Sequence, residues 1–437
     1  MLLPRSMGAA FTILLALLFL PPNARGQQPA GAPADTLLQL GDLLAEMRSN
    51  NPSLRASRLE ADALALQGRQ VSALPDPSVM IGYQPFPLLT ARGTQRSQWR
   101  VEQMIPYPGK LGLQGDIADL SAVVAGFEAE TYAEDLGFQV KQAYYELYRI
   151  QQQQKLILGF QERLQGFEGA AATQYEVGTG MQQAILKAQL ERNTLSQVTL
   201  DLAERRRTAA ETLAHLLNRP SSSAFMADIR VAAPPLPTFD EAALLAIAFN
   251  QRPEVDALEA ATERADVQIA LARKQFMPDF GFNVTYFDIG RFDVPPTATG
   301  RDALALGVSI KIPLQRDRLR ARLEEARVRR NQVEARREAL GRSFQTQIAD
   351  LLSRLREEEN QLSLYQEALI PQAETTLQST LSAYSTGRTD FLDLLDAERM
   401  LFSLHTGYEN TFTRYLKTTA ALERALGVPS LADLETR

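Results

Sequence analysis

Residues 280–286 read FGFNVTY and residues 304–312 read LALGVSIKI, and both segments alternate between large apolar side chains and small or polar ones. A sustained period of two is typical of a β-strand with one apolar face. Two weaker alternating segments, 78–86 and 97–105, occur earlier in the chain. The sequence therefore predicts four strands, each close to the length of about 9–11 residues with which a tilted strand crosses a membrane.

The two strand pairs belong to a unit that occurs twice. Landmarks of the first half recur about 200 residues later in the same order: Asn51-Pro52 as Arg252-Pro253, Pro106 as Pro313, Tyr175-x-x-Gly178 as Tyr384-x-x-Gly387, and Pro220 after LLNR as Pro429 after ALGV. Each half has the order helix, strand, strand, long helix, helix. We therefore expect repeats at 38–218 and 239–427, a Pro-rich linker at 219–238, and a C-terminal tail at 428–437.

Long helices are expected after each strand pair. Segments 112–176 and 317–384 contain almost no helix breakers, and about 65 helical residues span roughly 100 Å. Leu355, Leu362 and Leu369 have heptad-like spacing, and Pro371 is expected to bend the second helix. Shorter helices are expected at 38–74 and 181–218. The fold class predicted is mainly α with a small β part.

The composition argues against most catalytic and metal sites. The 437 residues include no cysteine and two histidines, His215 and His405, and the net charge of −6 gives no basis for binding nucleic acid. Gly109-Lys110 precedes a helix, but Met104 stands where a phosphate loop requires its first glycine. We therefore expect no cofactor, no metal site and no enzymatic activity, with both histidines in ordinary surface or packing positions.

The first 26 residues have the pattern of an export signal. Arg5 precedes the apolar run FTILLALLFL at 11–20, and Ala24-x-Gly26 provides a small-residue cleavage site. About ten apolar residues are too few to span the ~30 Å hydrocarbon layer as a helix. We expect a signal peptide at 1–26 and a flexible leader at 27–37.

Four strands from one chain cannot close a barrel. Unpaired strand edges are costly in lipid, so closure would require further copies, and two, three or four copies would supply 8, 12 or 16 strands. The strand pattern does not choose among these numbers. It also leaves open a soluble four-stranded sheet beneath a helical stalk.

Several segments resemble the TolC-type outer-membrane efflux family. The resemblance lies in the duplicated order of elements, Asn51-Pro52, PYPGKLGLQGDIA at 106–118, YEVGTG at 175–180 and YSTGRTDFLDLLDAER at 384–399. It implies a homotrimer with a 12-stranded β-barrel in the outer membrane and a coiled-coil-like α-barrel in the periplasm. It also implies a periplasmic adaptor and an inner-membrane pump of the RND type as partners. PGKLG at 108–112 is most similar to the heavy-metal efflux branch, whereas the lipidated cysteine of many relatives is absent from this sequence.

The resemblance also assigns roles to residues at the turns between long helices. The expected adaptor-docking residues are Tyr175, Val177, Gly178 and Thr179 at the first turn, and Tyr384, Gly387 and Arg388 at the second. Tyr384 and Arg388 resemble residues that latch a closed tip, although the arginine stands one place early. The alternative is that each glycine only ends a helix in the left-handed conformation.

Two aspartates and two strands complete the expected sites. Asp393 and Asp396 share one helix face and resemble carboxylates that line the periplasmic aperture. The alternative is helix capping, with Asp390 at the N-cap and Asp393 at N3, and surface solvation of Asp396. The lipid-facing residues expected on the strands are Phe280, Phe282, Leu304, Leu306, Val308 and Ile310. Trp99 is expected either in an aromatic girdle or in a packing position.

The leading hypothesis is an exit duct of a tripartite efflux system, which conducts substrates passively from the periplasm through the outer membrane. A duct of the same class could instead serve a protein-secretion system. A periplasmic coiled-coil scaffold protein would need no barrel and belongs to a different functional class.

Overall fold

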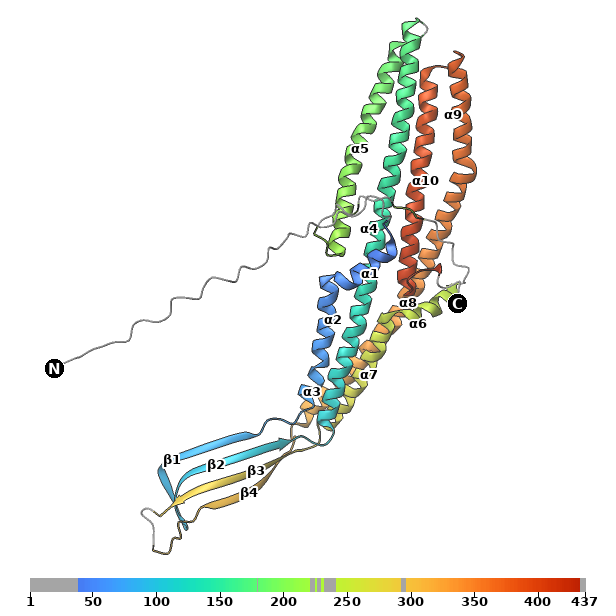
Figure 1. Ribbon diagram of the computed structural model, residues 1–437. Helices are drawn as coiled ribbons and strands as arrows, with labels where there is room; N and C mark the ends of the chain where they lie inside the picture. The colour runs from blue at the N-terminus through green and yellow to red at the C-terminus, as the bar shows by residue number, and fades with distance from the viewer. Residues whose placement is uncertain are drawn as a thin grey trace, which may run out of the picture.

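The computed structural model describes residues 38–178, 180–220, 225, 229–231, 241–291 and 296–432. The expected signal peptide and leader, Thr179, most of the expected linker and residues 433–437 lie outside these ranges. Within them, the molecule is elongated, with a sheet at one end and two helical hairpin tips at the other (Figure 1).

The same order of elements occurs twice along the chain. The first half contains α1 (Leu40–Asn50), α2 (Pro52–Ala65), α3 (Gln67–Val71), β1 (Ser78–Thr90), β2 (Gly93–Ile105), α4 (Lys110–Glu176) and α5 (Gln182–Leu216). The second contains α6 (Glu241–Gln251), α7 (Pro253–Lys274), β3 (Asp279–Gly290), β4 (Ala303–Lys311), α8 (Arg316–Leu364), a π-helix (Tyr365–Leu369), α9 (Ile370–Ser385) and α10 (Phe391–Leu426). The predicted mainly α fold with a small sheet is confirmed.

The single helix predicted at 38–74 is wrong, because this segment forms three helices. Asn51 ends α1 and caps α2, since its side-chain oxygen accepts from the backbone N–H groups of Ser53 and Leu54 at 3.0 Å each. Pro52 occupies the first turn of α2, where a missing N–H is tolerated. The Asn51 amide also donates to the Leu216 carbonyl at 2.8 Å, so this motif fixes the first helices to the end of α5.

The strands of the first half are longer than the predicted segments 78–86 and 97–105. β1 and β2 each contain 13 residues and are joined by a tight turn between Thr90 and Gly93. Gly93 has φ of 144°, which favours glycine at this turn. A register shift between Tyr83 and Leu88 interrupts the alternation, which explains why the sequence pattern fades there.

The long helix predicted at 317–384 is helical throughout, from Arg316 to Ser385, but it is not α-helical throughout. A five-residue π-helix, Tyr365–Leu369, separates α8 from α9 immediately before Pro371. Prolines and single-turn π segments are both sites at which long helices kink. Tyr365 lies against Gly407 of α10, where an added Cβ would approach its hydroxyl oxygen to 2.5 Å.

The four strands form one antiparallel sheet in the order β1-β2-β3-β4. The central pair, β2 and β3, comes from different halves of the chain, so the sheet joins the two repeats. Within the described residues, β1 and β4 each have a free edge.

Four buried apolar clusters hold the described helices together. One joins α1, α2 and α5 to the middle of α4 and to α10, and a second joins α6, α7, α8 and α10. A third lies among α4, α5, α9 and α10 toward the tips, and a small fourth joins α4 to α7. None of the described helices is both long and apolar enough to cross a membrane.

Candidate functional site

One face of the sheet is apolar and exposed. Residues directly opposite one another across the four strands form rows. One row consists of Val79, Val101, Val284 and Leu306, and a second consists of Ile81, Trp99, Tyr286 and Leu304. Leu306 is 78% exposed, and all other residues of both rows are more than a third exposed. A contiguous apolar face of this kind marks a surface that meets a membrane or another protein.

The opposite face of the sheet carries mostly small and polar side chains, with Met80 and Phe287 as larger apolar exceptions. The Arg100 guanidinium donates to the Thr285 hydroxyl at 3.1 Å, and Thr285 is 2% exposed. The Ser309 hydroxyl donates to the Glu102 carboxylate at 3.4 Å on this same side. The two faces therefore differ in the way that lipid-facing and lumen-facing residues differ in a membrane strand.

The six strand residues named from the sequence occur together on the apolar face. Phe280 pairs with Ile310, Phe282 with Val308 and Tyr286 with Leu304, and these pairs alternate with residues of the polar face. All six are at least partly exposed. Trp99 is half exposed in the same face, which excludes a buried packing position within this chain.

A partly buried ion pair joins the sheet to the helices. Gly109 has φ of 83°, and the Lys110 ammonium that follows lies 2.7 Å from the Asp279 carboxylate at the start of β3. Lys110 also donates to the Met277 carbonyl at 2.9 Å. The sequence singled out Gly109-Lys110 only as a turn that leads into a helix, because the partner lies 169 residues away.

The first hairpin tip is an open turn between α4 and α5. Gly178 has φ of 78°, and an added Cβ there would meet nothing within 4 Å. The Gly180 N–H closes the turn by donating to the Gln174 carbonyl at 2.9 Å. Tyr175 and Val177 are 47% and 68% exposed, so both present apolar surface at the end of the molecule.

The second tip, between α9 and α10, has a left-handed glycine like the first, but its closing hydrogen bond runs from the Arg388 N–H to the Ala383 carbonyl and its surface differs. Gly387 has φ of 69°, again in open space. Tyr384 is only 7% exposed and contacts Phe391 edge-to-face, with ring centroids 6.0 Å apart. Arg388 is exposed. The two tyrosines that match between the repeats therefore have opposite environments, and in this conformation Tyr384 packs within its own hairpin.

The three aspartates after the second tip differ in the contacts that they make. Asp390 is the N-cap of α10, since its carboxylate accepts from the N–H groups of Leu392 at 2.8 Å and Asp393 at 3.1 Å. Asp393 accepts from the Thr389 hydroxyl and is exposed. Asp396 is 74% exposed and lies 3.5 Å from Arg399. The carboxylates of Asp393 and Asp396 therefore face solvent on the described chain.

Ion pairs near the tips hold the two hairpins together. Arg163 of α4 binds Glu398 of α10, whose side chain is 0% exposed, and Arg399 of α10 binds Glu191 of α5. Sequence reasoning missed both pairs. The available signal was Glu398 itself, a carboxylate between the apolar positions Leu394 and Leu401 of an amphipathic helix.

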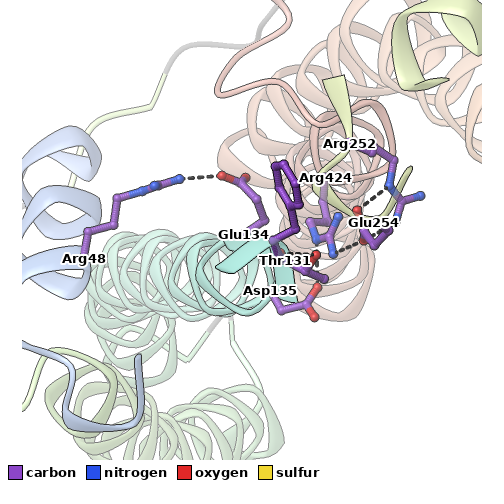
Figure 2. A network of polar contacts seen from close by, with 8 residues as sticks. Arg48, Thr131, Glu134, Asp135, Arg252, Glu254 and Arg424 are labelled. Carbon is purple, nitrogen blue, oxygen red and sulfur yellow. Dashed lines mark hydrogen bonds and ion pairs between the residues drawn. The ribbon is translucent and has the colours of Figure 1, made fainter. Parts of the chain in front are cut away.

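A second network joins three helices in the middle of the molecule (Figure 2). Arg424 of α10 contacts Asp135 of α4 and Glu254 of α7, each at 2.7 Å, and Arg252 also binds Glu254 at 2.7 Å. Burial alone would raise the pKa of Glu254, but the hydrogen bonds and charges of Arg252 and Arg424 outweigh it and lower that pKa to about 2.

The histidines contribute to no such cluster. His215 is exposed near the end of α5, and His405 is half-buried on α10. Within the described ranges, no group of three or more His, Asp or Glu side chains is arranged to hold a metal ion.

Comparison with known proteins agrees with this architecture. Residues 244–428 match the family model described as outer membrane efflux protein. The resemblance to the TolC-type outer-membrane efflux family is confirmed. The match covers α6 to α10, including both strands of the second half and the second hairpin tip.

Individual relatives of this family match over nearly the whole chain. The cobalt-zinc-cadmium resistance protein CzcC of Cupriavidus metallidurans is 23% identical over 94% of this chain and 98% of its own length. Crystal structures of CusC, described in connection with transmembrane channel formation, match with a TM-score of 0.74 at 19% identity over 90% of this chain and 93% of theirs. The outer membrane protein VceC of Vibrio cholerae matches with a TM-score of 0.72 at 20% identity over 89% and 96% of the two chains. At these identities, the structural matches establish the shared fold.

Proposed function

We propose that the chain is the outer-membrane exit duct of a tripartite efflux system and that it works as a homotrimer. The observation that carries this proposal is the exposed apolar face of the sheet, at the end of the molecule opposite to the hairpin tips. Burying that face in lipid removes its apolar surface from water, while the polar face lines an aqueous passage. The helices would then extend into the periplasm.

The topology of the sheet suits closure by identical copies. Because the four strands alternate in direction, β4 of one copy would run antiparallel to β1 of the next copy. Each free edge is then paired, as the interior of a membrane requires. The geometry allows several copy numbers, and the family resemblance favours three chains and 12 strands.

The helical tips are the proposed contact with a periplasmic adaptor, which would link the duct to an inner-membrane pump of the RND type. Tyr175, Val177 and Gly178 support this role because they present exposed apolar surface and an open turn. Gly387 and Arg388 are the proposed contacts of the second tip, whereas Tyr384 would support that tip from within. Thr179 belongs to the proposed contact by its position in the sequence.

The proposed cargo is a divalent metal cation, as the name of the cobalt-zinc-cadmium resistance relative suggests. The exposed carboxylates of Asp393 and Asp396 fit this proposal, because trimerisation would gather them into rings that attract cations. A duct conducts passively, so its proposed role involves no chemical reaction.

The test combines fractionation, mass and resistance. In a strain that lacks the gene, the restored protein should enter the outer membrane, purify in detergent with the mass of three chains, and restore growth on cobalt, zinc or cadmium. A monomer released with the periplasm would contradict the duct and favour the scaffold. Loss of a secreted protein without a change in metal resistance would favour the protein-secretion channel.

A further inference from the structure

The apolar band of strand β4 continues past the end of the strand and stops at a group of arginines. Every second residue from Leu304 to Leu314 is large, apolar and more than half exposed, and Leu314 itself is 81% exposed. Helix α8 begins two residues later, and its first turn contains Arg316 and Arg318. An exposed apolar surface therefore changes to a basic one within a few residues.

The basic residues form a local excess of positive charge, which we call the basic collar: Arg273 at the end of α7, Lys311 at the end of β4, and Arg316, Arg318, Arg320 and Arg322 in the first turns of α8. The segment from Lys311 to Arg322 alone has a net charge of +4, whereas the whole chain has a net charge of −6. The two helices meet here, since Arg322 donates to the Gln275 side chain at 3.3 Å.

Helix stability does not explain the collar. Positive side chains are unfavourable in the first turn of a helix, where the helix dipole is itself positive. Further along α8, arginines are matched by acids four residues away, as in Arg329–Glu325 at 2.7 Å. Within the collar, the Arg320 guanidinium lies 3.4 Å from the Asp317 carboxylate, and both side chains are exposed. Arg318 is exposed and has no hydrogen bond or ion pair among the residues that the structure describes.

We propose that the basic collar binds the headgroups of anionic phospholipids in the leaflet that surrounds the periplasmic end of the sheet. This inference rests on the proposed function, which places the apolar band in the hydrocarbon layer. The collar then lies at the depth of the headgroups, where long arginine side chains can keep their charge beside phosphate. The phosphate of a phosphatidylglycerol headgroup accepts paired hydrogen bonds from a guanidinium.

The magnitude of the effect follows from surface electrostatics. Each Lys or Arg close to an anionic membrane surface favours association by about fivefold, and screening removes the effect beyond a Debye length of about 10 Å at 0.1 M salt. We therefore expect the trimer to select phosphatidylglycerol over phosphatidylcholine at low salt, and to lose this selectivity at high salt.

The test is electron paramagnetic resonance of the purified protein in phosphatidylcholine vesicles that contain a trace of spin-labelled lipid. The fraction of motionally restricted label is compared for phosphatidylglycerol and phosphatidylcholine, both labelled on the acyl chain. For the unaltered protein, we expect at least a twofold preference for phosphatidylglycerol in 20 mM NaCl, falling to parity in 1 M NaCl. This salt dependence requires no variant.

Variants then locate the effect. Changing Arg316→Gln, Arg318→Gln and Arg322→Gln together should bring the preference close to parity. The matched control changes Arg336→Gln, Arg342→Gln and Arg354→Gln, which are exposed on the same helix, about 20 Å or more from the collar. This control should keep the preference of the unaltered protein, as should a collar variant with lysine in place of the three arginines.

The outcomes separate this inference from the proposed function. If lipid is restricted but shows no headgroup preference, lipid binding by the collar is wrong and the duct proposal stands. The same conclusion follows if the control variant loses the preference as fully as the collar variant does. A collar that faced the lumen or a neighbouring chain would likewise give restricted lipid without a headgroup preference. Absence of any restricted lipid would contradict the membrane position of the sheet itself, and both proposals would fail.

Discussion

Two exposed carboxylates, Asp393 and Asp396, decide whether the hairpin tips form a charged aperture. Asp390 caps α10, and Asp393 lies in the first helical turn, where the helix dipole favours a carboxylate, but neither effect accounts for Asp396. Both lie on one face of the helix, and three chains would supply six carboxylates. Rings of this kind favour cations in a pore.

The aperture is tested by single-channel conductance in planar bilayers. We expect the double variant Asp393→Asn, Asp396→Asn to lose cation preference and sensitivity to block by multivalent cations. Asp390→Asn is the matched control, because asparagine caps a helix about as well as aspartate while one charge is removed. Cation preference that survives in the double variant would exclude the aperture.

At the glycine of the second tip, a side chain can be added without a steric clash, so that only its effect on the backbone is measured. Gly387 has φ of 69°, and an added Cβ would meet no atom within 4 Å. Gly387→Val should therefore cost about 1–2 kcal/mol through backbone strain alone, whereas Gly387→Asn should cost less. We expect weaker crosslinking to the adaptor and reduced export with Val, but normal trimers. If Val and Asn variants crosslink equally well, the tip is only a turn.

The partly buried carboxylate of Glu254 leads to a prediction about pH. Its pKa of about 2 lies below its ordinary value of 4.5, so its stabilising contribution is complete above pH 4.5 and is lost as pH falls toward 2. Glu254→Gln should lower the free energy of unfolding by about 1–3 kcal/mol at pH 7. The difference from the unaltered protein should shrink between pH 4.5 and 2.

The measurement is thermal unfolding in detergent across this pH range. Glu259→Gln provides the control, because Glu259 and Arg337 form a pair in which both side chains are 57% exposed. Exposed pairs contribute little, so this variant should differ by less than about 0.5 kcal/mol. A constant penalty for Glu254→Gln down to pH 2 would contradict the assigned pKa.

At the scale of the elements, the π-helix between α8 and α9 is the clearest departure from regular structure. Gly407 makes room for Tyr365 at this point, since an added Cβ would lie 2.5 Å from the tyrosine hydroxyl and 3.0 Å from its ring. Alanine is the better helix former, so a purely local view would expect Gly407→Ala to stabilise α10. We expect instead a loss of about 1–3 kcal/mol from overpacking.

A double variant separates the two explanations. Replacing the ring with a smaller side chain, Tyr365→Leu, should remove the clash, so that Gly407→Ala costs nothing further in that background. Melting temperatures of the four proteins in detergent provide the double-mutant cycle. A stabilising Gly407→Ala in the unaltered background would mean that the two helices do not meet closely at this point.

The elements also show which features were readable from the sequence. The strands β3 and β4 and the long helices were predictable because period two and the absence of breakers are local signals. The division at Asn51-Pro52 was visible in the sequence but was assigned only as a repeat landmark. The π-helix was not predictable, because it depends on the proline and on packing against α10 together.

Most of the features that the sequence did not predict depend on contacts between residues that are distant in the chain. Lys110 and Asp279, or Arg163 and Glu398, are separated by more than 150 residues, and no local pattern links them. The opposite environments of Tyr175 and Tyr384 likewise depend on neighbouring side chains, although their sequence motifs match. The positions of the candidate site residues on strands and tips were therefore predictable, but their exposure and partners were not.

At the scale of the whole molecule, the account depends on the sheet having one face in lipid and the other toward water. The elongated shape places the sheet and the hairpin tips at opposite ends, joined by α4, whose 67 residues span about 100 Å (Figure 1). If the sheet lies in the outer membrane, the tips reach deep into the periplasm, where an adaptor can meet them.

Maleimide labelling of single cysteines tests this central claim most directly, since the chain contains no cysteine of its own. Leu306→Cys and Ser309→Cys lie on opposite faces of β4, and Thr297→Cys lies in the described part of the loop between β3 and β4. In intact outer membranes, a membrane-impermeant maleimide should react with Cys at 309 and 297 and leave Cys at 306 unlabelled. After denaturation, all three should react. Labelling of position 306 in the intact membrane as fast as position 309 would contradict the account.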